Sequence, residues 1–200
     1  LFSDWIRDHS FILRGKQYFF ADVKDAVELF GGTQADDGMI YDFLMPKNPQ
    51  STNTFRRFAN PKHLAHIDDP GYYLQRVPVE ADVEYLYVDA LHQTWKATGD
   101  TEWMTTWLDS AVRAMDYCRT DELRWSRKFQ LIKRGFTIDT WDFQDTDNTR
   151  ISGGDVMEAV PDKTRFGIFH GDNTGYAASC DALAQMLEVA GRTQEAQSWR

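Results

Sequence analysis

Apolar positions recur at helical spacing over two stretches of the chain and predict a repeated pair of antiparallel helices. One stripe belongs to a helix near 80–98 and contains Val83, Tyr87, Ala90, Leu91 and Trp95. Gly at position 99 is expected to end this helix, and Asp100 to cap a second helix near 101–117. Residues 89–107 and 181–199 agree, without a gap, at seven of nineteen positions. Self-similarity of this kind is typical of repeated helical units.

Two further helices are predicted, one over 10–30 that ends at Gly31 and Gly32, and one over 174–190. Cys118 and Cys180 are expected to face the core from helices, and two cysteines cannot build a disulfide framework. Long polar and aromatic segments, 32–79 and 119–171, separate the helices, and stretches 38–44 and 129–141 predict short strands. Long loops in a compact domain are usually functional or disordered, and this aromatic content favours function.

Composition excludes several classes of protein. Hydrophobic residues make up 42% and charged residues 26% of the 200 positions, which excludes a disordered chain. Asp and Glu outnumber Lys and Arg by 31 to 22, so we expect neither nucleic acid nor an anionic membrane as a partner. No run approaches the roughly 20 apolar residues of a membrane span. The chain opens at Leu1 without Met and stops at Arg200 inside a predicted helix. We therefore expect residues 1–200 to be part of one larger domain, truncated at both ends, with its cellular location open.

Candidate chemistry lies in acidic and aromatic clusters beside the predicted helix ends. In residues 139–145 three carboxylates are interleaved with Trp141 and Phe143. Aromatic rings can stack on the apolar faces of sugars, and carboxylates can accept their hydroxyls. Glycosidic cleavage also needs a carboxylic acid of raised pKa, and Asp142 has apolar neighbours that favour such a rise. Three other clusters, at 5–9, 34–38 and 76–82, also fit a helix-entry ion pair, a turn and a helix start.

Taken in order, these clusters resemble motifs of the six-hairpin (α/α)6-barrel glycoside hydrolases, near glucoamylase, the inverting trehalases and debranching-type α-glucosidases. A W-x-R-D segment of that family is matched by Trp5, Arg7 and Asp8. An R-P-x-x-D segment is resembled, with altered spacing, by Arg76, Pro78, Glu80 and Asp82. The W-D-F form of the acid motif is matched by Trp141, Asp142 and Phe143.

The resemblance implies an all-α fold, the N-terminal half of an (α/α)6 toroid. It implies hydrolysis of an α-glucosidic bond with inversion, in an oligosaccharide or polysaccharide, without cofactor or metal. Asp142 would be the general acid, and the general base would lie beyond Arg200. Sugar would be bound or walled by Trp5, Arg7, Asp8 and Trp141, with Asp37 and Asp82 as second-rank candidates.

Other readings stay open. Asp139 and Asp145 remain alternatives to Asp142 as the acid. A phosphorylase or a sugar epimerase could use the same fold, because fold does not fix reaction. A non-catalytic carbohydrate-binding or helical scaffold protein is an alternative from another class. Residues 145–148 space oxygen ligands as calcium loops do, but Arg150 stands where such a loop needs Gly, so a turn is expected there.

Overall fold

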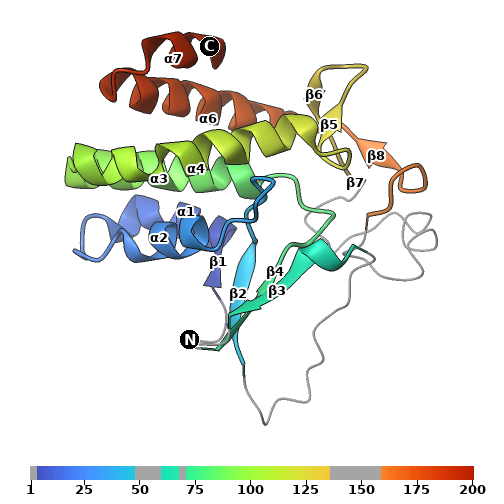
Figure 1. Cartoon of the computed structure of the whole chain (residues 1–200), viewed down its shortest axis with the longest axis horizontal. Helices are drawn as coiled ribbons and strands as arrows, with labels where there is room; N and C mark the ends of the chain where they lie inside the picture. Colours follow the sequence, from blue (N-terminus) through green and yellow to red (C-terminus); the bar gives the residue numbers. More distant parts are fainter. Residues whose placement is uncertain (1–3, 48–59, 68–70, 136–158) are drawn as a thin grey trace.

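The computed structural model describes residues 4–47, 60–67, 71–135 and 159–200. Its helices form three stacked layers (Figure 1). The layers are α1 with α2, α3 with α4, and α6 with α7. The helix bounds are Ile6–Lys16 for α1, Asp25–Gly32 for α2, Val83–Thr98 for α3, Thr101–Thr120 for α4, His170–Val189 for α6 and Thr193–Ser198 for α7. Helix α3 is central, because it packs against α1, α4 and α6.

The repeated helix pair is confirmed, and local chemistry explains its boundaries. Gly99 ends α3 in the left-handed region at φ 68°, where glycine pays no steric cost. Asp100 then caps α4, its Oδ1 accepting a 3.0 Å hydrogen bond from the backbone N–H of Trp103. The helices bury a shared apolar core, and Cys118 of α4 and Cys180 of α6 lie in it as expected.

The prediction of one helix over 10–30 is wrong, although its end at Gly32 is confirmed. Helix α1 stops at Lys16, and the next eight residues turn before α2 starts at Asp25. Tyr18, Phe19 and Phe20 are 61–82% exposed in this turn, while Val23 is buried. Three successive aromatic residues would point around a helix in three directions, so a turn that brings Val23 to the core competes successfully with a longer helix.

Three small antiparallel sheets lie at the end of the layers where α1, α3 and α6 begin (Figure 1). The largest has the strand order β1-β2-β4-β3. Its strands are Asp4–Trp5 (β1), Phe43–Pro46 (β2), Tyr72–Gln75 (β4) and Leu64–Ile67 (β3), the last preceded by a 3-10 turn at Pro61–His63. The other two sheets pair Trp125–Ser126 (β5) with Leu131–Ile132 (β6) and Arg134–Gly135 (β7) with Phe166–Gly167 (β8). Strands β2, β6 and β7 overlap the stretches 38–44 and 129–141.

The all-α (α/α)6 toroid expected from the resemblance is therefore wrong for this chain. The described residues form a mixed structure of six helices and eight short strands. The long segments between helices carry backbone N–H and C=O groups that need partners, and ladder pairing supplies them. Only the antiparallel helix pairs match the expectation.

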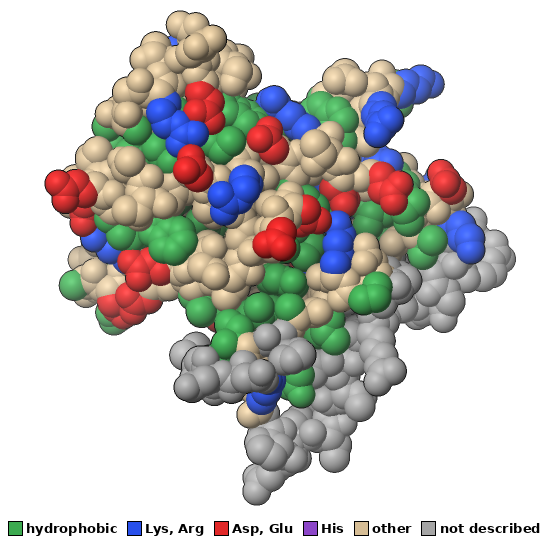
Figure 2. All heavy atoms as spheres, viewed as in Figure 1, with side chains coloured by type: hydrophobic (Ala, Val, Ile, Leu, Met, Phe, Trp, Pro, Cys, Tyr) green, Lys and Arg blue, Asp and Glu red, His purple; other side chains and the backbone are tan. Residues whose placement is uncertain are grey.

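The outer surface is mixed in character. On the face shown in Figure 2, acidic and basic side chains are interspersed over the helical layers. Within the described residues, no helix is both long and apolar enough to cross a membrane.

Candidate functional site

Side chains connect the first turns of three helices at the end of the molecule that carries the sheets. Arg7 of α1 reaches Asp82, the residue that precedes α3. Tyr85, in the first turn of α3, reaches Asp172 in the first turn of α6. These contacts join residues 75 and 87 positions apart in the sequence.

Arg7 holds two carboxylates at once. Its Nε and Nη2 donate to the two oxygens of Asp82 at 2.7 and 2.6 Å, the paired geometry that suits a guanidinium. Its Nη1 donates to Oε1 of Glu80 at 3.2 Å, and Nη2 lies 3.0 Å from Oε2. The side chain of Glu80 is 1% exposed, whereas those of Asp82 and Arg7 are 14% and 19% exposed. Asp82 is therefore the carboxylate of this cluster that solvent can still reach.

The two carboxylates differ in protonation. Burial alone would raise the pKa of Asp82, but hydrogen bonds from Arg7 and its positive charge outweigh burial and lower the pKa. For Glu80 burial dominates and raises the pKa to about 7, with Arg7 opposing the rise and Asp82 adding to it. Arg7 therefore fixes Asp82 as an anion, while Glu80 titrates near neutral pH.

Two buried arginines support the loop that carries these carboxylates. Arg76 is fully buried and pairs with Glu84 at 3.1 and 3.0 Å. The remaining guanidinium donors of Arg76, and one from Arg124, reach backbone carbonyls of the loop. These carbonyls belong to Val77, Pro78 and Glu80. Because every one of these bonds is shielded from water, the loop before α3 has little freedom to move.

Asp42 ties α1 to the same loop. Its carbonyl accepts from the backbone N–H of Ile6 at 2.9 Å, and its Oδ2 accepts from the backbone N–H of Val77 at 3.0 Å. Burial raises the pKa of Asp42 well above its usual range. Asp42 thereby sets the position of Arg7, the neighbour of Ile6, relative to the loop of Glu80 and Asp82.

The structure brings together some of the residues predicted from sequence. Trp5 lies in β1, two residues before Arg7, and stacks on Phe43 with ring centroids 4.2 Å apart. Arg7 and Asp82 bond directly. Asp8 is exposed on α1 and makes no hydrogen bond or ion pair with the described residues.

Asp37 has a structural role in a turn. Its Oδ1 accepts from the backbone N–H of Met39 at 3.2 Å, and its Oδ2 lies 3.1 Å from Nζ of Lys62. It has no contact with Arg7 or Asp82. Trp141 and Asp142 lie outside the described residues, as do Asp139 and Asp145.

Sequence reasoning did not assign Glu80, Tyr85 or Asp172 to the site. Glu80 falls within the motif at 76–82, where the resemblance includes it without giving it a role. Tyr85 lies among the apolar positions of α3 and is not distinguished from them by the sequence pattern. It follows Asp82 by three residues, a spacing that places two residues on the same side of a helix. Asp172 lies just before the helix predicted over 174–190, where its position indicates a helix start rather than a site.

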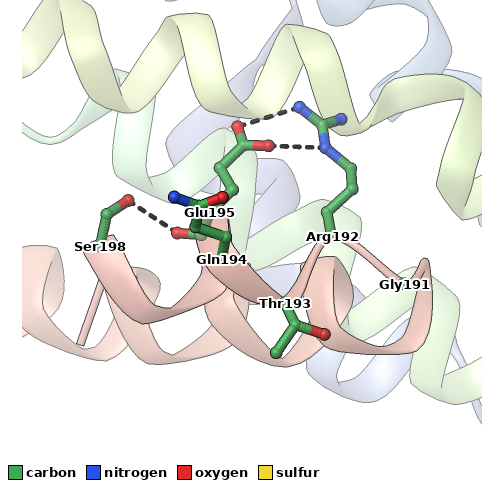
Figure 3. Close-up of a pocket in the computed structure, with 6 residues that line it drawn as sticks. All are labelled: Gly191, Arg192, Thr193, Gln194, Glu195 and Ser198. Atoms are coloured by element: carbon green, nitrogen blue, oxygen red, sulfur yellow. Dashed lines mark hydrogen bonds and ion pairs between the residues drawn. The ribbon is translucent and has the colours of Figure 1, made fainter.

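A surface hollow elsewhere in the chain does not offer a comparable arrangement. It follows the C-terminal end of α6 and is lined by residues 191–195 and 198 (Figure 3). Arg192, its only basic side chain, is engaged by Glu195 at 2.7 and 2.9 Å and by Asp109 at 2.6 Å. In the part of the chain that the structure describes, no cluster of His, Cys, Asp or Glu could hold a metal ion.

Comparisons with models of known protein families, with curated proteins and with solved structures found no match to this chain. The geometry at the start of α1, α3 and α6 is accordingly the basis for assigning a function.

Proposed function

We propose that this chain is part of a glycoside hydrolase that cleaves an α-glucosidic bond with inversion of configuration. One observation carries the proposal: Arg7 holds Asp82 as an oriented, partly exposed anion. Arg7 itself follows Trp5, whose ring stacks on Phe43, by two residues in the sequence. A sugar presents hydroxyl donors at its edge and apolar C–H groups on its faces. The oriented carboxylate of Asp82 offers acceptors for the hydroxyls, and an aromatic ring such as that of Trp5 offers a surface for the C–H groups.

The contacts refine the roles expected of Arg7 and Asp82. The Nε and both Nη atoms of Arg7 donate to carboxylates of the protein. We therefore assign Arg7 the role of orienting Asp82 and keeping it ionised. An ionised carboxylate offers about four lone-pair sites, and Arg7 uses two on Asp82. The others can accept sugar hydroxyls, and Asp82 becomes the primary sugar-binding residue of the proposal.

Asp142 remains the proposed proton donor on the strength of its sequence neighbourhood, with Trp141 as a wall of the pocket. In an inverting hydrolase the acid protonates the leaving oxygen, while a second carboxylate activates water on the opposite face of the sugar. No residue is assigned to the second role.

The proposal is tested on the full-length protein with α-linked disaccharides, by following the anomer released with NMR. We expect β-anomer to appear first. Release that requires inorganic phosphate would indicate a phosphorylase, and binding without release would indicate a carbohydrate-binding protein. Either result would contradict the proposal.

The acid is tested by Asp142→Asn, which keeps the side-chain shape but removes the titratable proton. Hydrolysis of the disaccharide should fall by roughly 10²–10⁴-fold. The matching glycosyl fluoride should be affected distinctly less, because fluoride leaves with little protonation. Asp139→Asn and Asp145→Asn are the matched controls. Equal losses on both substrates would make Asp142 a binding residue instead.

A further inference from the structure

A further carboxylate, Asp172, lies on the neighbouring helix α6, close enough for the charge of Asp82 to act on it. Tyr85 connects the two helices, and its hydroxyl donates to Oδ1 of Asp172 at 3.4 Å. The ring of Tyr85 can approach α6 because residue 175 is glycine. A Cβ there would lie 2.7 Å from Cε2 of Tyr85, too close for any side chain.

Asp172 is buried with half of its acceptor capacity unused. Its side chain is 9% exposed, and Nη1 of Arg134 lies 3.9 Å from Oδ1. The other oxygen, Oδ2, is shielded from solvent and accepts no hydrogen bond from the residues that the structure describes. Buried polar atoms in native proteins nearly always have a partner, and an unsatisfied one is costly. Oδ2 is therefore a buried acceptor that can take a hydrogen bond from a donor outside the described residues.

Electrostatics connects Asp172 with the site already described. Burial raises the pKa of Asp172, Arg134 opposes the rise, and the negative charge of Asp82 adds to it. Tyr85 is near both carboxylates, because the negative charges of Asp82 and Asp172 each add to the rise that burial causes in its pKa. Asp82 and Asp172 thus belong to the same charged environment.

We propose that Asp172 is a further substrate-binding residue, whose Oδ2 accepts a hydrogen bond from a sugar hydroxyl while Tyr85 holds Oδ1. The inference rests on the proposed glycoside hydrolase activity. A neutral hydroxyl suits this position better than a charged ligand. An anion would be repelled by Asp82 and Asp172, and a cation would meet the guanidinium of Arg134 close to Oδ1. Because Oδ2 has no donor among the described residues, a hydroxyl that reaches it would satisfy a buried acceptor.

The test compares Asp172→Asn with Asp181→Asn in the full-length protein. Asp181 is exposed on the same helix, so it receives the same chemical change away from the site. Substrates are the disaccharide that the wild type cleaves and its monodeoxy derivatives. We expect Asp172→Asn to lower kcat/KM at least tenfold and Asp181→Asn to leave it unchanged. One monodeoxy derivative should be a poorer substrate for the wild type yet suffer no additional loss in Asp172→Asn.

The outcomes separate the two proposals. If the wild type neither binds nor cleaves any α-linked disaccharide, the proposed function fails. If the wild type is active but Asp172→Asn behaves like Asp181→Asn, the role of Asp172 is refuted, and Oδ2 meets only a buried water.

Should Asp172→Asn not fold, Tyr85→Phe carries the test. This change keeps the ring against Gly175 and removes only the hydroxyl that orients Asp172. We expect KM to rise severalfold with little change in Tm. An unaltered KM would overturn the inference.

Discussion

Replacing Arg7 with Met tests the contact on which the proposed site depends. The change keeps an unbranched side chain in α1 but removes every bond to Glu80 and Asp82, all at 3.2 Å or less. Two carboxylates would then face each other without their cation. Removing one partner of a buried ion pair costs about 3–5 kcal/mol. Because Arg7 keeps some exposure, we expect the lower end, about 3 kcal/mol.

This loss should be visible in thermal melts of the full-length protein. For a domain of this size each kcal/mol lowers Tm by about 2–4 °C, so we expect a decrease of about 6–12 °C. The decrease in Tm caused by Arg7→Met should be smaller at pH 5 than at pH 7, because Glu80 and Asp82 can take up protons once the cation is absent.

Arg14→Met is the matched control on the same helix. Arg14 is 60% exposed and lies 3.5 Å from Asp89, so its removal should cost no more than about 1 kcal/mol. The reasoning is refuted if both variants lower Tm equally, or if the penalty of Arg7→Met is the same at both pH values.

Three further predictions concern the support of the site. Asp42→Asn should lower the free energy of unfolding by less than about 1 kcal/mol, since an amide resembles the protonated acid. Asp42→Ala should lower it by about 1–3 kcal/mol, because the backbone N–H of Val77 loses its acceptor. Urea unfolding of the two variants measures the difference. Gly175→Ala should lower the free energy of unfolding by about 1–3 kcal/mol, because the new Cβ would clash with Tyr85. Gly171→Ala should not, since a Cβ there would have no atom within 4 Å. Similar melts for both variants would contradict this. The folded-state pKa of Glu80 is raised from 4.5 to about 7, so the folded protein binds more protons in this range and its stability should fall as pH rises through it. Glu80→Gln should flatten that fall in urea unfolding measured across pH, and an unchanged slope would exclude Glu80 as its source.

The sequence by itself determined the features that depend on neighbouring residues. The boundary between α3 and α4 is an example, because Gly99 and Asp100 act on the backbone groups beside them. The core-facing stripe of α3 is another, since helical geometry alone places residues three and four apart on one side. The motif residues Trp5 and Arg7 were likewise visible as a local cluster.

Only the tertiary structure decided which distant groups meet. Helical periodicity could not show that α1 would stop at Lys16, because the burial of Val23 competes with a longer helix. Nor could a local pattern show that the segments between helices would pair as strands, since a ladder depends on the register of two separate stretches.

The candidate site is the clearest case. Arg7 and Glu80 are 73 residues apart, and Tyr85 and Asp172 are 87 apart. The sequence around a residue does not indicate which carboxylate a guanidinium will bind. Nor does it indicate how far burial will move the pKa of that carboxylate. Both depend on the packing of α1, α3 and α6, which excludes water from Glu80 and leaves Asp82 within its reach.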